Sequence, residues 1–340
     1  MPPSMPQGQH TLIIGASGAI GKSLIAQLTA AHGDHSVIAC INRTPLPKEL
    51  AAVAIQEHGV SVLDEASVQR VLAKHAATIG CIWMLAAPLS VDTARDPSLA
   101  EAVTVGGMGS LLRCMRTAGL TRLCFSDSIG SFGATSPRRN ADARWLAEHP
   151  TQDPGSDYGL QKRQCRELMR EYQEIDTRWA VIPGVLHSAD SWGGGTTEYA
   201  LEAMAAAASG GTFACPIPVG VELPMVWISD LCAGLIALQE APRSALREPE
   251  GGYAIAGFSF TAEELFARLR PEFPDFVVEM QLDPDAAAFA QLWPDTISGD
   301  AAARDLEFRA TVGLEQAVEM AVAAHRDRAS KVAGSATPSL

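Results

Sequence analysis

Short apolar runs alternate with stretches of helical periodicity over the first half of this 340-residue chain. The predicted strands cover residues 11–15, 37–41, 60–63, 79–85, 122–126 and 178–182, and the predicted helices cover residues 20–31, 65–76, 99–118 and 158–174. Residues 37–41 are apolar at every position, so both faces of that strand must be covered. The alternation predicts an α/β fold, a doubly wound parallel sheet with helices on both sides.

The pattern changes near residue 183. Glycine and proline cluster at residues 193–195 and 215–218, and Ala- and Leu-rich helices with short extended pieces follow. We therefore expect an α/β domain over residues 10–183 and a smaller C-terminal lobe over residues 184–327, with tails at residues 1–9 and 328–340. Residues 226–228 and 253–255 are candidates to return to the main sheet.

Composition excludes several classes of partner. The formal net charge of −13 repels nucleic-acid phosphates and anionic lipid surfaces. No run approaches the roughly 18 apolar residues of a membrane span, and the start of the chain has no basic segment followed by an apolar one, so we expect a cytoplasmic protein. The seven cysteines are scattered in apolar settings without metal-ligand spacing, which predicts buried thiols in a reducing compartment and no metal site.

The first predicted strand runs into a G-x-x-G-x-x-G loop that opens a helix. Glycines allow the backbone to turn tightly and to approach a pyrophosphate at the positive end of the helix. Such a loop alone is also found as an ordinary turn, but its place in the first βαβ unit favours a dinucleotide cofactor. The expected cofactor contacts are Gly15, Ser17, Gly18, Ala19, Ile20 and Gly21, with Leu85, Ala86 and Ala87 after the fourth strand and Pro183 after the sixth.

The choice between NAD and NADP depends on the end of the second strand. An acidic residue that would bind the ribose diol is expected there, yet residues 39–44 contain none. Arg43, with Asn42 beside it, is suited to a 2′-phosphate and favours NADP, although a solvated arginine fits the same pattern. Asp64 is placed either to accept from the adenine amino group or to cap the following helix.

Tyr158 and Lys162 are four residues apart and therefore lie on one face of a predicted helix. A phenol is a poor base at neutral pH, but a nearby ammonium and a positive nicotinamide ring favour the phenolate and lower the phenol pKa. Ser128 lies about 30 residues upstream, after the fifth predicted strand, where a doubly wound sheet binds its ligands. Its hydroxyl is suited to hydrogen-bond a substrate oxygen.

The glycine loop, Ser128, Tyr158 and Lys162 occur in the order and spacing of the extended short-chain dehydrogenase/reductase family, which the chain resembles over roughly residues 10–325. The blocks at residues 193–200, 223–225, 254–260 and 293–297 resemble the L-threonine 3-dehydrogenase subfamily. The resemblance implies a Rossmann-type NAD(P)-binding domain, a C-terminal substrate lobe, and oxidation of a threonine hydroxyl.

The resemblance also implies roles for individual residues. Tyr158 would be the general base, Lys162 its electrostatic partner and ribose anchor, and Ser128 the residue that binds the reacting oxygen. The implied substrate contacts are Ser90, Asp127, Ser128, Gly184, Thr196, Thr197 and Trp293. Trp293 is equally consistent with lobe packing, and Thr196 and Thr197 with a cap for the helix that begins near residue 198.

Four positions depart from the family pattern. Asp127 occupies the first hydroxyl position of the family's Ser-Thr pair, where it would pair with a substrate ammonium or lie as a solvated turn residue. Val181 replaces an arginine that is a natural carboxylate partner, Gly106 replaces an asparagine, and Ile41 replaces the aspartate of the second strand. These changes leave the hydride-transfer residues intact and affect cofactor choice and substrate recognition.

The sequence thus favours an NAD(P)-dependent oxidoreductase that interconverts an alcohol and a ketone at C3 of L-threonine, a related β-hydroxy-α-amino acid, or a derivative. A nucleotide-sugar epimerase or dehydratase shares the same residues, and a cofactor-binding protein without turnover is a third alternative. The resemblance implies a homodimer through the helices at 99–118 and 158–174, although the same apolar faces are suited to pack on the sheet.

Overall fold

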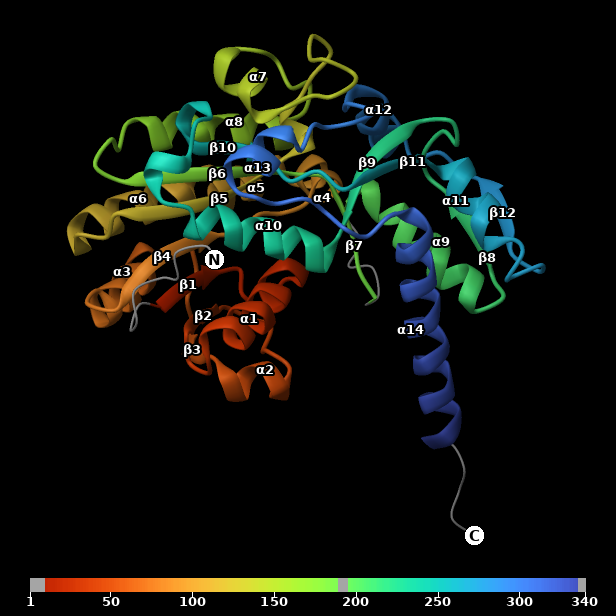
Figure 1. Cartoon of the computed structure of the whole chain (residues 1–340), viewed down its shortest axis with the longest axis horizontal. Helices are drawn as coiled ribbons and strands as arrows, with labels where there is room; N and C mark the ends of the chain where they lie inside the picture. Colours follow the sequence, from red (N-terminus) through yellow and green to blue (C-terminus); the bar gives the residue numbers. More distant parts are fainter. Residues whose placement is uncertain (1–9, 189–194, 336–340) are drawn as a thin grey trace.

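A computed structural model describes residues 10–188 and 195–335. Its main sheet has seven parallel strands in the order β10-β6-β5-β4-β1-β2-β3 (Figure 1). The strands are β1 (His10–Ile14), β2 (Val37–Ile41), β3 (Ile55–His58), β4 (Ile79–Met84), β5 (Arg122–Ser128), β6 (Asp176–Ile182) and β10 (Gly252–Ala254). The direction of winding reverses between β1 and β4, which is where such sheets bind ligands. The predicted Rossmann-type fold is confirmed.

Helices cover both faces of the sheet, as its apolar strands require. One face packs against α1 (Ala19–His32) and α10 (Ile228–Glu240), and the other against α3 (Glu65–His75), α6 (Gly107–Ala118) and α8 (Asp157–Arg170). All five residues of β2 are buried. The remaining helices are α2 (Lys48–Val53), α4 (Ser90–Arg95), α5 (Pro97–Glu101), α7 (Ala143–Glu148), α9 (Tyr199–Ala208), α11 (Ala262–Leu269), α12 (Pro284–Leu292), α13 (Asp300–Asp305) and α14 (Leu314–Ser335).

The helix predicted over residues 99–118 is built from three pieces. Asp96 caps α5 by accepting a hydrogen bond from the Leu99 backbone N–H, a π-helical turn spans Ala102–Gly106, and α6 completes the helix. At the other end of the chain, α14 continues to Ser335, through part of the segment predicted as a C-terminal tail. Residues 1–9 and 336–340 of the predicted tails lie outside the described residues.

The third strand was predicted in the wrong place. The structure puts β3 at Ile55–His58, a half-exposed edge strand whose polar residues give no apolar signal. Gly59 has φ +67°, a conformation that glycine adopts readily, and turns the chain at the end of β3. Val60 and Val62 follow as irregular chain and bury their side chains in the core beneath α3 and α6.

The C-terminal lobe contains two small sheets. A three-stranded sheet joins β7 (Gly184–Leu186), β9 (Glu222–Trp227) and β11 (Phe258–Thr261), and a two-stranded sheet joins β8 (Thr212–Cys215) and β12 (Val277–Met280). Residues 253–255 return to the main sheet as predicted, because β10 pairs with β6. The corresponding prediction for residues 226–228 was wrong: Val226 and Trp227 belong to β9, which pairs with β7 and β11.

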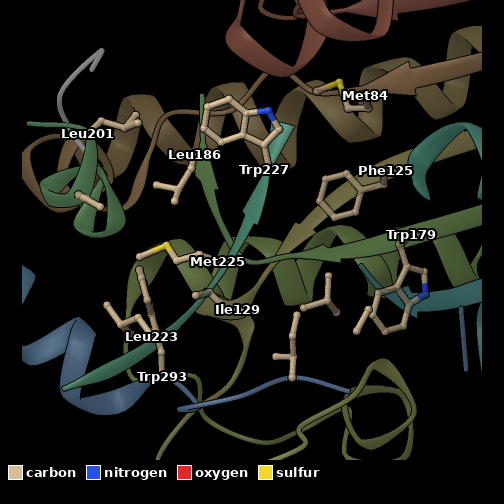
Figure 2. Packing of buried hydrophobic residues seen from close by; sticks show 14 of the residues in the cluster. Met84, Phe125, Ile129, Trp179, Leu186, Leu201, Leu223, Met225, Trp227 and Trp293 are labelled. Carbon is tan, nitrogen blue, oxygen red and sulfur yellow. The ribbon is translucent and has the colours of Figure 1, made fainter. Parts of the chain in front are cut away.

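One apolar cluster continues from the main sheet into the lobe (Figure 2). Phe125 and Trp179 contribute from β5 and β6, Leu223 and Met225 from β9, and Trp293 from the end of α12. All five side chains are buried. Because the core is continuous, the lobe and the carboxyl ends of the strands form fixed walls around the space between them.

The thiols lie inside the protein. All seven cysteines are buried and free, as predicted. Burial raises the pKa of Cys232 to about 12, so this thiol is protonated at neutral pH. Across residues 10–188 and 195–335, no helix is both long and apolar enough to cross a bilayer.

Arg178 on β6 attaches α10 to the sheet. Its wholly buried guanidinium donates to the backbone carbonyls of Leu238, Gln239 and Ala241 at 2.6, 3.1 and 2.7 Å, and it also pairs with Asp176. A cation at the C-terminal end of a helix satisfies carbonyls that have no partner within the helix.

Replacing Arg178 with Met should lower the free energy of unfolding by about 3 kcal/mol, because it leaves buried carbonyls unpaired. Urea denaturation followed by circular dichroism measures the change. The matched control is Arg139→Met, which removes an exposed ion pair with Glu222 and should leave the free energy of unfolding almost unchanged. Equal losses in the two variants would contradict this role of Arg178.

Candidate active site

A cavity of about 490 Å³ lies between the carboxyl ends of the main strands and the C-terminal lobe. It brings together most of the residues that the sequence singled out. Those that line it are Gly15, Gly18, Ala19, Ile20, Gly21, Leu85, Ala86, Ala87, Ser90, Asp127, Ser128, Tyr158, Lys162, Pro183, Gly184, Thr196, Thr197 and Trp293. Ser17, Asn42, Arg43 and Asp64 are not among its lining residues.

The glycine loop forms a close-fitting cradle at one end of the cavity. Gly15 has φ +93°, and a Cβ placed on it would lie 2.8 Å from the backbone nitrogen of Ala86. A Cβ on Gly21 would lie 2.5 Å from the carbonyl oxygen of Gly15. The helix α1 begins directly after this loop with no acidic residue in its first turn. These features fit the pyrophosphate of a dinucleotide, which needs close backbone approach and the positive helix end.

The end of β2 lies beside this loop. Ser17 Oγ donates to the carbonyl of Thr44 at 2.5 Å, which ties the glycine loop to the segment after β2. Asn42 and Arg43 are exposed there, and within the described part of the chain no hydrogen bond or ion pair holds the Arg43 guanidinium. Asp64 caps α3 by accepting from the Ala66 backbone N–H at 3.1 Å, so of its two predicted roles the structure shows the cap.

The helix α8 presents Tyr158 and Lys162 to the cavity. Ser156 caps this helix by accepting a hydrogen bond from the Gly159 N–H at 3.1 Å, which places Tyr158 in its first turn. Lys162 is only 2% exposed, and its Nζ donates to the carbonyl of Ser126 at 2.7 Å. The same ammonium lies 5.4 Å from the centre of the Tyr158 ring.

The turn after β5 brings Ser128 to the phenol. Ser128 ends the strand, and its Oγ accepts from the Gly130 N–H at 3.1 Å. A Cβ on Gly130 would lie 2.7 Å from the Tyr158 ring, and a Cβ on Gly159 would lie 2.0 Å from the Gly130 carbonyl oxygen. Two glycines therefore permit α8 and this turn to pack directly on each other.

Asp127 has a different environment from the one expected. It is 2% exposed rather than a solvated turn residue, and its Oδ2 accepts a short hydrogen bond from Arg166 of α8. Its Oδ1 accepts from the Ser128 N–H at 2.8 Å and the Ser131 hydroxyl at 2.5 Å. The sequence reasoning missed Arg166. Its position four residues after Lys162, on the same helix face, could have revealed it as the counter-ion of a carboxylate on an apolar strand.

The opposite wall comes from α4 and the lobe. Ser90 Oγ lies 3.1 Å from Thr196 Oγ1 and accepts from the Thr196 N–H at 3.2 Å. The predicted cap function of the two threonines was wrong, because α9 begins after Glu198 and has no side-chain cap. A Cβ on Gly184 would lie 2.2 Å from Met225 Sδ, so the wall leaves no room for a larger residue.

Trp293 packs within the lobe and also forms part of the cavity wall, so the structure is consistent with both predictions made for it. It is 3% exposed, stacks on Phe289 with ring centres 6.1 Å apart, and still lines the cavity. His187 and Glu198 also line the cavity and were missed. They flank the glycine-rich segment whose residues 189–194 lie outside the described part of the chain. No motif includes His187, and Glu198 lies in the block at residues 193–200 without a predicted site function.

The departures at positions 181, 106 and 41 lie away from the cavity lining. Val181 pairs with Asp127 across β5 and β6 and is completely buried. Gly106 is an exposed residue of the π-helical turn, and Ile41 ends β2 with its side chain buried. The change at Val181 therefore alters the packing beneath the site rather than its wall.

Comparisons with known proteins agree with this geometry. The model of the NAD dependent epimerase/dehydratase family matches residues 11–245. The mitochondrial L-threonine 3-dehydrogenase of Bos taurus is 30% identical over 322 residues, which cover 91% of this chain and 81% of that protein. A GalE-like L-threonine dehydrogenase from Cupriavidus necator, solved in its holo form, is 30% identical with a TM-score of 0.81, covering 92% of this chain and 99% of that one.

A third relative is described as monomeric. A monomeric L-threonine 3-dehydrogenase from a metagenome database, solved in its apo form, is 26% identical with a TM-score of 0.83, covering 93% of this chain and 99% of that one. The chain thus belongs to the NAD dependent epimerase/dehydratase family, within the extended short-chain dehydrogenases/reductases, and is a nicotinamide-dependent enzyme that acts on CH–OH groups.

Proposed function

We propose that the protein interconverts an alcohol and a ketone at C3 of L-threonine, a related β-hydroxy-α-amino acid, or a derivative. One observation carries the proposal: a single cavity joins the glycine cradle to Ser128, Tyr158 and Lys162, and then to the polar pair of Ser90 and Thr196. The names of the relatives that are 30% identical over most of the chain support the same substrate class.

Each catalytic side chain has a defined task in this proposal. When bound, the nicotinamide group supplies the hydride acceptor or donor. Tyr158 takes the proton of the substrate hydroxyl as phenolate, or returns it in the reverse direction. Ser128 Oγ already accepts from the Gly130 N–H, so its own proton is available for the reacting substrate oxygen.

The Lys162 ammonium has more hydrogen-bond donors than the Ser126 carbonyl uses. An ammonium has three donors, and the Ser126 carbonyl takes one of them at 2.7 Å. The others are available for a ribose hydroxyl of the cofactor, and the charge stabilises the phenolate of Tyr158. Trp293 and Thr197 line the lobe side, where they would exclude water and orient the substrate.

The same site allows two further functions. A nucleotide-sugar epimerase or dehydratase would regenerate its cofactor in every cycle and show no net nicotinamide reduction, and a non-catalytic cofactor-binding protein would show none with any substrate. We also propose a homodimer through α6 and α8, although the metagenome relative is described as monomeric. Sedimentation at micromolar concentration distinguishes one copy from two.

Replacing Tyr158 with Phe should reduce kcat by about 10²- to 10⁴-fold, because the proton then has no acceptor. The assay follows nicotinamide absorbance with L-threonine or a β-keto derivative, with NAD and NADP tested separately. Binding of reduced cofactor, measured by its fluorescence, should stay unchanged and serves as the control. Unchanged turnover in this variant would refute the assigned base.

Replacing Gly15 with Ala should weaken dinucleotide binding by about 100-fold or more, because the new Cβ would collide with the backbone at Ala86. Gly33→Ala is the matched control. Its φ of +90° is nearly that of Gly15, but nothing lies within 4 Å of its Cβ position. Fluorescence titration with reduced cofactor compares the two variants. Equal losses would show that backbone strain, rather than the cradle, controls binding.

We further propose that the enzyme prefers NADP, with Arg43 beside Asn42 binding the 2′-phosphate. The exposed guanidinium next to the glycine loop, and the apolar Ile41 where an acid would bind the ribose diol, support this preference. Asp64 remains a candidate only for the adenine edge, since it already caps α3.

Replacing Arg43 with Gln should raise the Kd for NADPH by about 10- to 100-fold, because a charge-assisted contact to phosphate is lost. The Kd for NADH should change by less than about twofold, since that cofactor has no 2′-phosphate. Calorimetry with both cofactors gives the ratio of the Kd for NADPH to the Kd for NADH. A wild-type enzyme that binds NADH more tightly than NADPH would contradict the preference.

A further inference from the structure

A buried ion pair supports the carboxyl end of β5. Neither the comparisons with known proteins nor the proposed reaction gives this pair a function. The side chain of Asp127 is completely buried, and that of Arg166 is 2% exposed. Burying two charges is costly unless each is paired and hydrogen-bonded. Here the pair shares a third member, because Arg166 Nη1 also donates to Ser131 Oγ at 3.1 Å.

The pair connects the two parts of the chain that carry the catalytic groups. Arg166 belongs to α8, one turn after Lys162 and two turns after Tyr158. Asp127 precedes Ser128 on β5, and its Oδ1 accepts from the Ser128 backbone N–H at 2.8 Å. The ion pair therefore links the helix that carries the base to the strand end that carries the hydroxyl donor.

The same contacts define the turn against which Tyr158 packs. Ser131 closes the turn by donating to Asp127 Oδ1 at 2.5 Å. Within this turn, Gly130 lies against the Tyr158 ring so closely that a Cβ would be 2.7 Å from it. A change in the ion pair would thus displace Gly130 and Ser128 relative to the phenol.

The layer behind the site supports the guanidinium. Arg166 lies with its Cζ 5.0 Å from the centre of the Trp179 ring, a cation–π contact on the neighbouring strand β6. Val181, two residues further along β6, lies opposite Asp127 and is fully buried. The position at which the family has an arginine is therefore apolar here, and the guanidinium beside Asp127 comes from α8 instead.

The charges of the pair and the charge of Lys162 act on one shared neighbour, the Cys165 thiol. Cys165 lies between these charges on α8: burial raises its pKa to about 12, and Lys162, Asp127 and Arg166 all act on this thiol. Lys162 also lies 5.4 Å from the Tyr158 ring centre. Removing one charge of the pair would leave the other unbalanced in this region, so we expect such a change to alter the electrostatic potential at the phenol.

We propose that Asp127 and Arg166 are positioning residues. Together they hold Ser128 in a fixed position relative to Tyr158, and as an ion pair they add no net charge to the surroundings of Lys162. This inference rests on the proposed function for its kinetic test, and a second test without substrate keeps the two separable. Asp127 lines the cavity, but its carboxylate oxygens already accept from Arg166, Ser131 and the Ser128 N–H, so we assign the pair no direct contact with the reacting atoms.

The kinetic test compares Asp127→Asn, Arg166→Gln and the double variant with wild type. Each single variant should lose about 10- to 100-fold in kcat per cofactor-binding site, with KM within about twofold, because a shift of about 1 Å in the catalytic groups has this effect. The double variant should recover at least about tenfold of that loss, because two neutral amides keep the hydrogen bonds without an unpaired charge. The double variant also tests the inference if a single variant folds poorly.

The matched control is Arg170→Gln. Arg170 lies one turn beyond Arg166 on α8 and pairs with Glu250 at 2.7 Å, away from the site. It should change neither kcat nor KM. A purely structural role for Arg166 would lower Tm but leave kcat per binding site within about twofold of wild type. That result in both single variants, or additive losses in the double variant, would overturn the inference.

The second test measures tyrosinate absorbance against pH in the enzyme without substrate. The chain has four tyrosines. Burial raises the pKa of Tyr253 to about 12 and that of Tyr199 further, so these two tyrosines do not contribute to the signal at lower pH. Subtracting the signal of Tyr158→Phe isolates Tyr158. Asp127→Asn should move its transition to lower pH and Arg166→Gln to higher pH, whereas Arg170→Gln should not move it.

Other charged groups near Tyr158 stay constant in this comparison. They are Lys162 on its own helix, Asp153 and Asp157 beside a neighbouring hollow, and His187 and Glu198 across the cavity. Opposite shifts of the Tyr158 transition in the two variants, in an enzyme that turns over no substrate, would refute the proposed function and support the positioning role of the ion pair. Turnover that depends on Tyr158, with no shift of the transition and no loss of kcat in either variant, would refute the positioning role alone.

Discussion

The buried hydrogen bond from Lys162 to the carbonyl of Ser126 sets the geometry on which the site depends. It joins α8 to the end of β5 at a position where both partners are almost completely removed from water. An ammonium is stable in such a place only when its donors have partners, so the helix and the strand have one mutual position. The contact of Gly130 with the Tyr158 ring and the ion pair of Asp127 with Arg166 secure the same position from either side.

The rest of the molecule makes this arrangement useful. The parallel sheet brings the glycine cradle of β1 and the catalytic turn of β5 to one edge, because the strands between them share a direction. The lobe closes the edge with Gly184, Thr196 and Trp293, and the apolar cluster that spans both parts removes freedom between them (Figure 2). The glycine cradle, the side chains of Ser128, Tyr158 and Lys162, and the residues of the lobe thus line one cavity with fixed walls.

Much of this could be predicted from the sequence. Apolar runs predicted the sheet, and the glycine spacing predicted the cradle. The spacing of Tyr158 and Lys162 predicted that both lie on one face of a helix. Two kinds of error remain. The strand β3 was misplaced because an edge strand has no apolar signal. The alternative that Asp127 is a solvated turn residue was wrong because a local pattern does not show a partner 39 residues away. Long-range pairs such as this one, and cavity residues such as His187, become visible only when the topology brings distant segments together.

Deuterium transfer tests the central claim most directly. The purified enzyme would be incubated with L-threonine deuterated at C3, and with a panel of similarly labelled β-hydroxy-α-amino acids, using NAD and NADP in separate reactions. The account predicts that the reduced nicotinamide carries the deuterium and that Tyr158→Phe abolishes the transfer. Reduced nicotinamide without deuterium, or no reduction from any labelled alcohol together with no oxidation of reduced cofactor by the matching ketones, would contradict it.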